Sequence, residues 1–92
     1  MAATYDPAKR EWTLRERGLD FAEAELVFAF ATIDIPDLRR DYGEPRINSV
    51  GYLRGRMVIV CWTQRGDARH IISMRKANDR EKARYRQRYE EG

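Results

Sequence analysis

The first third of the chain spaces its apolar residues as helices do, and the ends of these segments carry clear signals. Asp6 precedes Pro7, a typical helix start, because aspartate caps free N–H groups and proline has none to lose. We expect a helix over residues 7–17 that ends at Gly18, since glycine readily adopts the left-handed conformation that closes helices.

A second helical signal follows directly. Asp20 and Glu23 have the spacing of a capping box, in which each side chain bonds to the other residue's backbone N–H. Apolar residues continue from there at helical spacing, which predicts a short helix over residues 21–30. The pattern therefore predicts two N-terminal helices.

After Thr32 the pattern changes to the alternation and β-branched runs of strands. Strands are expected over residues 32–35, 46–53, 57–63 and 69–76, joined by a polar loop at 36–44 and by turns at 54–55 and 65–67. The apolar run 57–63 favours a central strand buried on both faces. In the last strand, alternation places His70, Ile72 and Met74 on one face and Ile71, Ser73 and Arg75 on the other.

A third helical signal closes the chain. Asn78 and Glu81 have capping-box spacing, and a helix is expected over residues 79–89. Short turns between neighbouring strands require antiparallel pairing, and helices packed on one face make the class α+β. We expect a single domain over residues 1–92, with two N-terminal helices, an antiparallel sheet of three to five strands and a C-terminal helix. A short strand before residue 7 fits this order.

Charge is unevenly distributed along the chain. The 18 Lys and Arg residues and 15 Asp and Glu residues give a net charge of +3. Residues 1–45 hold six basic and ten acidic side chains, whereas residues 46–92 hold twelve basic and five acidic ones. The second half, at +7 against −4 for the first, is expected to face a polyanion such as nucleic acid, or an acidic protein partner.

Several classes of protein do not fit this composition. The chain has no apolar run of the about 18 residues that suggest a membrane-spanning helix, and it does not begin as a secretory signal does. The single cysteine, Cys61, and the single histidine, His70, are too few for an internal disulfide or a typical structural zinc site. We therefore expect a cytoplasmic domain without a metal or cofactor.

Five motifs occur in order along the chain. They are Asp6-Pro7-Ala8-Lys9, Gly18-Leu19-Asp20-Phe21, Asp41-Tyr42-Gly43-Glu44-Pro45-Arg46, Thr63-Gln64-Arg65-Gly66-Asp67 and Ile71-Ile72-Ser73-Met74-Arg75-Lys76-Ala77. Together with Glu81 and Tyr85, they resemble the BrnT family of bacterial toxins. The resemblance implies a RelE-like fold, a ribonuclease that arrests translation, and a BrnA-type antitoxin. That antitoxin would carry a ribbon-helix-helix element for operator DNA and form a heterotetramer of two toxins and two antitoxins.

The chain departs from the family pattern in its first helix. The family usually has asparagine where Thr13 stands, and a Lys-His pair where Glu16-Arg17 stands. Because Arg17 stands where the family has histidine, any catalytic role of that histidine as a base is lost in this chain. The departures also leave open that the toxin is attenuated.

Arginine, lysine, tyrosine and glutamate carry the candidate chemistry. Metal-independent RNA cleavage needs deprotonation of the 2′-OH, positive charge for the phosphorane and an acid for the 5′-oxygen. The resemblance implies that these roles are spread over such side chains instead of a histidine pair. The candidate catalytic residues are Arg46, Arg65, Arg75, Lys76, Ser73, Glu81 and Tyr85.

The last predicted strand carries the main phosphate-binding candidate. Arg75 has a planar guanidinium that matches phosphate geometry, and Ser73 shares its strand face. Lys76 faces the opposite side if the strand stays regular, and the site if the strand has ended. The alternative for these cations is a solvated sheet edge that resists aggregation.

A second cationic group is expected at one end of a hairpin. Arg46 and Arg65 lie approximately opposite each other there and form a pocket with Glu44. The alternative is an ordinary surface ion pair. Lys9 on the first helix faces either this end of the sheet or solvent.

The remaining candidates have structural alternatives. Glu81 either caps the last helix or orients an arginine or accepts a proton. Tyr85 and Tyr89 either stack on bases or pack the helix onto the sheet. Three residues are expected in or beside the core: Trp62, Cys61 and a half-buried His70.

These inferences lead to two functional hypotheses. The leading one is a metal-independent endoribonuclease toxin that inhibits translation, with RNA as substrate and a BrnA-type antitoxin as partner. The alternative is a non-catalytic module whose basic half binds an acidic protein or a nucleic acid without breaking a bond.

Overall fold

The computed structural model describes residues 2–91 and contains a five-stranded sheet in the order β1-β5-β4-β3-β2. The strands are β1 (Ala2–Tyr5), β2 (Ile33–Pro36), β3 (Ile47–Leu53), β4 (Arg56–Arg65) and β5 (Ala68–Lys76). The helices are α1 (Pro7–Arg17), the 3₁₀ turn η1 (Phe21–Glu23), α2 (Ala24–Phe28) and α3 (Asp79–Glu91). The predicted α+β class is confirmed.

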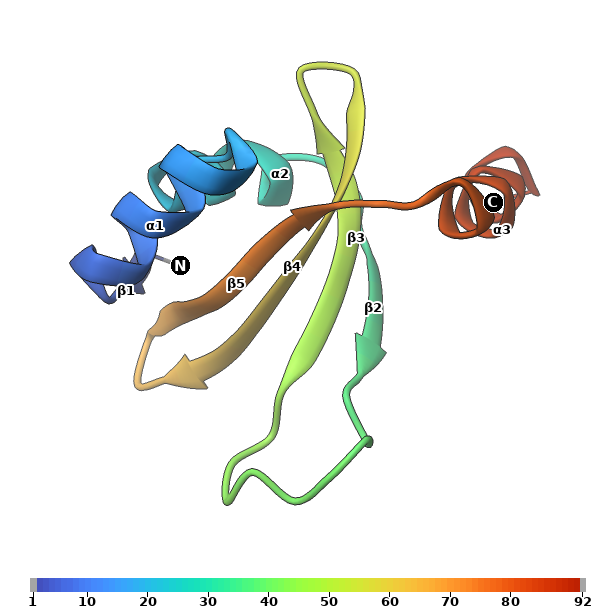
Figure 1. The fold of residues 1–92 in the computed structure, drawn as a ribbon. Coiled ribbons are helices and arrows are strands. Elements are labelled where there is room, and N and C mark those ends of the chain that lie inside the picture. Colours follow the sequence, from blue (N-terminus) through green and yellow to red (C-terminus); the bar gives the residue numbers. More distant parts are fainter. Residues whose placement is uncertain (1, 92) are drawn as a thin grey trace.

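The helices lie on both sides of the sheet instead of one, with α1 and α2 on one side and α3 on the other (Figure 1). We call these sides the α2 face and the α3 face. The core of the α2 face includes Phe21 and Val27, packed with Val60 and Trp62 of β4. On the α3 face, a second cluster consists of Val50, Met57, Ile59, Ala77 and Tyr85. Residues 57–63 are all buried, which confirms the predicted central strand.

Most signals at the helix ends act as predicted. The Asp6 carboxylate accepts a bond from the Ala8 N–H at 2.9 Å, and Gly18 closes α1 with a φ of 69°. Asp20 also caps its segment, but the Glu23 side chain pairs with Arg54 and does not complete a capping box. The second helix therefore begins as a 3₁₀ turn and ends sooner than predicted.

The first strand breaks the expected antiparallel order. β1 pairs with β5 in parallel, whereas the other three pairings are antiparallel. Beyond the end of β1, helix α1 takes over the edge of β5, where Arg17 Nη1 donates to the Met74 carbonyl at 2.9 Å. A side chain thereby satisfies an edge carbonyl that would otherwise need water or another strand.

A β-bulge in β5 changes which side chains share a face. Cys61 pairs with Ser73, and Trp62 pairs with Ile71, so Ile72 is an extra residue. Ile71 and Met74 consequently both enter the core of the α2 face. The predicted alternation along β5 is wrong at this point, because one inserted residue reverses the phase of every residue before it.

The bulge also moves the histidine. His70 was expected on the same face as Met74, but it lies opposite Thr63 on the α3 face. It is half-buried, as predicted, and its Nδ1 lies 2.9 Å from Oγ1 of Thr4 on β1.

Within residues 2–91, no helix has the length and apolar character needed to cross a membrane.

Strand β3 passes very close to α2 at Gly51. A Cβ atom added there would stand 2.5 Å from Cγ1 of Val27. We expect Gly51→Ala to lower the free energy of unfolding by about 1–3 kcal/mol, because overpacking displaces neighbours. Urea unfolding measures this loss. The double variant Gly51→Ala/Val27→Ala should lose less free energy of unfolding than the sum of the losses in the two single variants. Strictly additive losses would contradict the proposed collision.

Candidate active site on the α3 face

The loop between β2 and β3 folds around a buried carboxylate. The Asp37 side chain is 1% exposed and accepts bonds from Nε and Nη2 of Arg39 at 2.9 and 2.8 Å. Tyr42 Oη donates to the same carboxylate at 3.3 Å. The Arg39 guanidinium holds the pKa of Asp37 down, to about 2. These bonds fix the shape of the loop and keep Asp37 charged.

Glu44 brings together two of the predicted arginines. Its Oε2 lies 3.7 Å from Nε of Arg46, and its Oε1 lies 3.5 Å from Nη2 of Arg65. The expected approximate alignment is confirmed, because Ile47 pairs with Trp62, so that Arg46 comes within two positions of lying opposite Arg65. Strand pairing thus brings the two arginines to the same end of the sheet, and Glu44 of the loop contacts both.

Arg75 and Glu81 form the second charged group. Nη1 and Nη2 of Arg75 donate to the two carboxylate oxygens of Glu81 at 2.7 and 2.9 Å. Glu81 also forms the predicted capping box with Asn78, at 2.8 and 3.0 Å. Both structural expectations for Glu81 hold together, since it caps α3 and orients an arginine.

The electrostatics of this pair limit its chemistry. The bonded Arg75 guanidinium lowers the pKa of Glu81 to about 2. A carboxylate with so low a pKa is a poor proton acceptor near neutral pH. Glu81 is thus suited to holding Arg75 in place and poorly suited to acid–base catalysis.

Ser73 lies between these two groups along β5. Along β5, the residues on the α3 face follow the order His70, Ser73, Arg75 opposite Thr63, Cys61 and Ile59. Arg46, one residue before β3, stands near the level of Thr63, about 13 Å along the strands from Arg75. Within residues 2–91, no ion pair joins Arg75 to the Glu44 group. The predicted site is therefore an extended track and not one compact cluster.

Arg39 lies close enough to Arg75 for its charge to affect that residue, and it was not among the residues predicted from the sequence. Its side chain is 77% exposed although Asp37 holds its guanidinium. The pKa of Arg75 is raised mainly by its hydrogen bond to Glu81, and the positive charge of Arg39 opposes this rise. The signal in the sequence that could have pointed to Arg39 is Asp37, two positions before it, which binds its guanidinium.

Lys9 of α1 also belongs to this region. It lines a cavity of about 180 Å³ together with Thr13 and Ser73. Burial lowers the pKa of His70, and the charges of Arg65 and Lys9 lower it further. Lys9 is exposed, as the solvent alternative expects, and the cavity that it lines contains neither Arg46 nor Arg65.

Two predicted catalytic residues do not join the track. Lys76 pairs with Val58 and so lies on the α2 face, opposite Arg75, because β5 remains regular to its end. Tyr85 is 9% exposed and packs in the α3-face core. Tyr89 likewise anchors α3, since its hydroxyl donates to the carbonyls of Ala31 and Val50 at 3.0 and 2.9 Å.

The other core expectations are confirmed. Trp62 is buried, and its Nε1 donates to Oγ of Ser49 at 2.8 Å. Cys61 is buried as well, and this burial raises the pKa of its thiol. The described part of the chain, residues 2–91, contains no cluster of three or more metal-binding His, Cys, Asp or Glu side chains.

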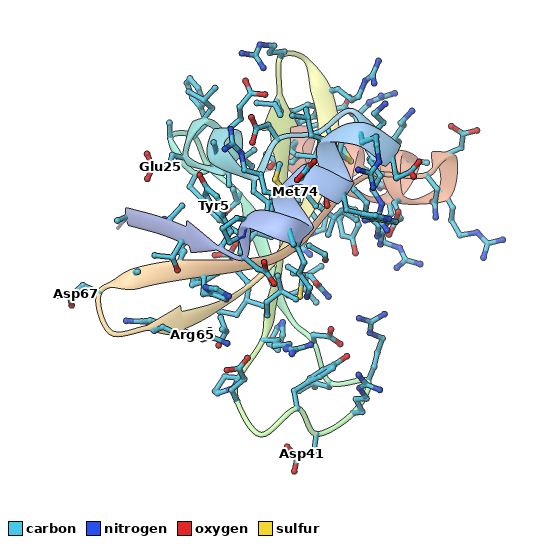
Figure 2. The ribbon with its side chains drawn as sticks, turned by 60° about the vertical axis from the view of Figure 1, so that its left-hand side comes forward. Tyr5, Glu25, Asp41, Arg65, Asp67 and Met74 are labelled. Carbon is cyan, nitrogen blue, oxygen red and sulfur yellow. The ribbon has the colours of Figure 1, made fainter. Side chains whose placement is uncertain are left out.

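Figure 2 shows where the loop group lies. Arg65 stands near the end of β4, and Asp41 marks the tip of the loop beyond the same end of the sheet. Helix α3, whose core contacts are with Met57 and Ile59, packs toward the other end of these strands. The charged track thus runs from the loop to the start of α3.

The chain matches a known protein family over most of its length. The family model described as "Ribonuclease toxin, BrnT, of type II toxin-antitoxin system" matches residues 5–81. The chain belongs to the BrnT family. A comparison with curated proteins finds none that matches.

The BrnT match covers every charged residue of the track. It begins at Tyr5 and ends at Glu81, so it leaves out Tyr85. A type II toxin–antitoxin family implies RNA as the substrate and an antitoxin as a partner. The departures from the BrnT pattern have structural uses here, since Thr13 is buried and Arg17 bonds to the edge of β5.

Proposed function

We propose that this BrnT-family chain is an endoribonuclease that cleaves RNA without a metal ion and thereby arrests translation in the cytoplasm. Residues 1–92 would act as one toxin domain with a RelE-like arrangement of helices and sheet. The observation that carries the proposal is the arginine track on the α3 face, where Glu81 holds Arg75 in position and Glu44 lies near both Arg46 and Arg65.

The track suits the charge requirements of RNA cleavage. Arg75 and the exposed Arg39 would bind one phosphate, and Arg46 with Arg65 would bind a neighbouring one. Preorganised cations at the place where negative charge develops are a large source of rate enhancement. Ser73 lies between the two groups and can donate a hydrogen bond to a phosphate or 2′-oxygen.

The same surface explains how an antitoxin would act. We propose a BrnA-type antitoxin with a ribbon-helix-helix element, bound as two toxins and two antitoxins, through which the complex reaches operator DNA. Covering Arg46, Arg65 and Arg75 would exclude RNA. The proposal predicts a short reading frame for such a protein next to this gene.

The decisive experiment incubates total RNA with the purified chain, with and without EDTA. We expect cleavage in both reactions, because the positive charge is supplied by side chains. Loss of cleavage in EDTA that returns with added Mg²⁺ would contradict metal independence. Intact RNA with a retained gel shift would instead support the alternative, a non-catalytic module that binds through its basic half.

A further inference from the structure

The loop between β2 and β3 lines an open cavity beside the proposed phosphate-binding group. Its volume is about 430 Å³, within the range of about 300–1,000 Å³ of ligand sites. It adjoins the proposed phosphate-binding group, because Arg46 and Glu44 line it. The residues that matter for its chemistry are Pro36, Leu38, Tyr42, Glu44, Pro45 and Arg46.

The walls of this cavity are flat and partly apolar. The Arg46 guanidinium carbon lies 3.9 Å from the centre of the Tyr42 ring, and that of Arg40 lies 4.9 Å from it. Leu38 contributes an apolar side chain and is 86% exposed. Aromatic rings and guanidinium planes are the surfaces on which proteins stack the bases of single-stranded RNA.

Glu44 supplies the polar recognition group. Its contacts with Arg46 and Arg65, at 3.7 and 3.5 Å, are longer than the about 2.7–2.9 Å of strong charge-assisted hydrogen bonds. The carboxylate therefore retains acceptor capacity. Guanine presents two adjacent N–H donors, N1–H and N2–H, on its Watson–Crick edge, whereas adenine, cytosine and uracil do not. A carboxylate accepts such a pair through both oxygens.

Hydrogen bonds within the loop hold the walls of this cavity in place. Asp37 ties the loop together through Arg39 and Tyr42, and its own N–H donates to the Arg46 carbonyl at 2.8 Å. At the tip, the Gly43 N–H donates to the Asp41 carboxylate at 2.8 Å. A preorganised loop loses less conformational entropy when it binds.

We propose that this cavity is a subsite for a guanine base, next to the phosphate held by Arg46 and Arg65. The guanine stacks on the guanidinium planes that cover the Tyr42 ring, and its Watson–Crick edge bonds to Glu44. The inference rests on the proposed function and deepens it, because it assigns base preference to the loop and phosphate binding to the arginines.

Binding of non-cleavable RNA tests this directly. The probes are fluorescein-labelled 2′-O-methyl pentanucleotides of sequence UUNUU, with each of the four bases at N, and the readout is the Kd from fluorescence anisotropy. We expect the guanine probe to bind about tenfold more tightly than the others, as one good bidentate pair gives. Glu44→Gln should reduce the ratio to near one. The control Glu23→Gln removes an equal charge at a carboxylate paired with Arg54, and should keep the preference.

The ratio of the affinity for the guanine probe to the affinity for the other probes separates base recognition from general charge attraction. Glu44→Gln also releases two arginines and strengthens binding of every probe, but that effect cancels in the ratio. Leu38→Ser, a change at an exposed position, should weaken the guanine probe most. Equal binding of all four probes, or a preference that survives Glu44→Gln, overturns the inference. The proposed function fails separately, if unmodified RNA is not cleaved.

Discussion

Arg75→Ala is expected to lower kcat/KM for RNA cleavage by about 100-fold or more, as loss of one preorganised donor to a developing oxyanion does. The Arg75 side chain is 45% exposed, so it can contact a phosphate while Glu81 holds its orientation. Arg75→Lys should retain part of the activity, because it keeps the charge but loses the planar fork. A fluorogenic RNA oligonucleotide with initial-rate kinetics measures the effect.

Arg80→Ala is the matched control for this prediction. Arg80 is exposed on the first turn of α3, one residue before Glu81, and its loss changes the net charge by the same amount. We expect this variant to stay within about twofold of the unmodified chain, since the charge of Arg80 is exposed and screened by salt. Equal losses in both variants would show that Arg75 contributes general positive charge only. Circular dichroism of each variant checks that the fold is kept.

Phe21→Ala is expected to lower the free energy of unfolding by about 3–5 kcal/mol, as removal of a buried phenylalanine does. Phe21 is 1% exposed, lies in the α2-face core, and makes an edge-to-face contact with Tyr5 at 6.1 Å between ring centres. Small domains are stable by only about 5–15 kcal/mol, so this variant should be close to unfolding at physiological temperature. Urea and thermal unfolding measure the loss.

Phe30→Ala is the control for that loss. Phe30 follows α2 and is 78% exposed, so its removal leaves no cavity. Changes at such positions usually stay within about 0.5 kcal/mol. A loss from Phe30→Ala equal to that from Phe21→Ala would contradict the assignment of Phe21 to the core.

Local signals in the sequence predicted most elements of the fold. The caps at Asp6, Gly18 and Asn78 work because each acts within a few residues. The end of the second helix was predicted less well, because tertiary contacts compete there: Glu23 bonds to Arg54 instead of completing its capping box. The parallel pairing of β1 has no local signal, since its partner lies more than sixty residues away.

The candidate site was predictable in its residue types but not in its grouping. Arg46 and Arg65 do share Glu44, and Arg75 does bind Glu81. Their separation into two ends of a track depends on strand register, which no single residue encodes. Lys76 could belong to the site only if the strand ended before it, but β5 stays regular to its end and sends Lys76 to the face opposite Arg75.

The amino-acid sequence by itself determined the α+β class, the central strand, the helix starts and the excess of positive charge in the second half. The tertiary structure decided the bulge at Ile72, the cavity that Lys9 and Ser73 both line, and the cavity beside Asp37. The physical reason is the separation along the sequence of the residues that interact. Caps and alternation depend on neighbouring residues, whereas a bulge, a buried carboxylate and a loop cavity exist only when distant segments meet.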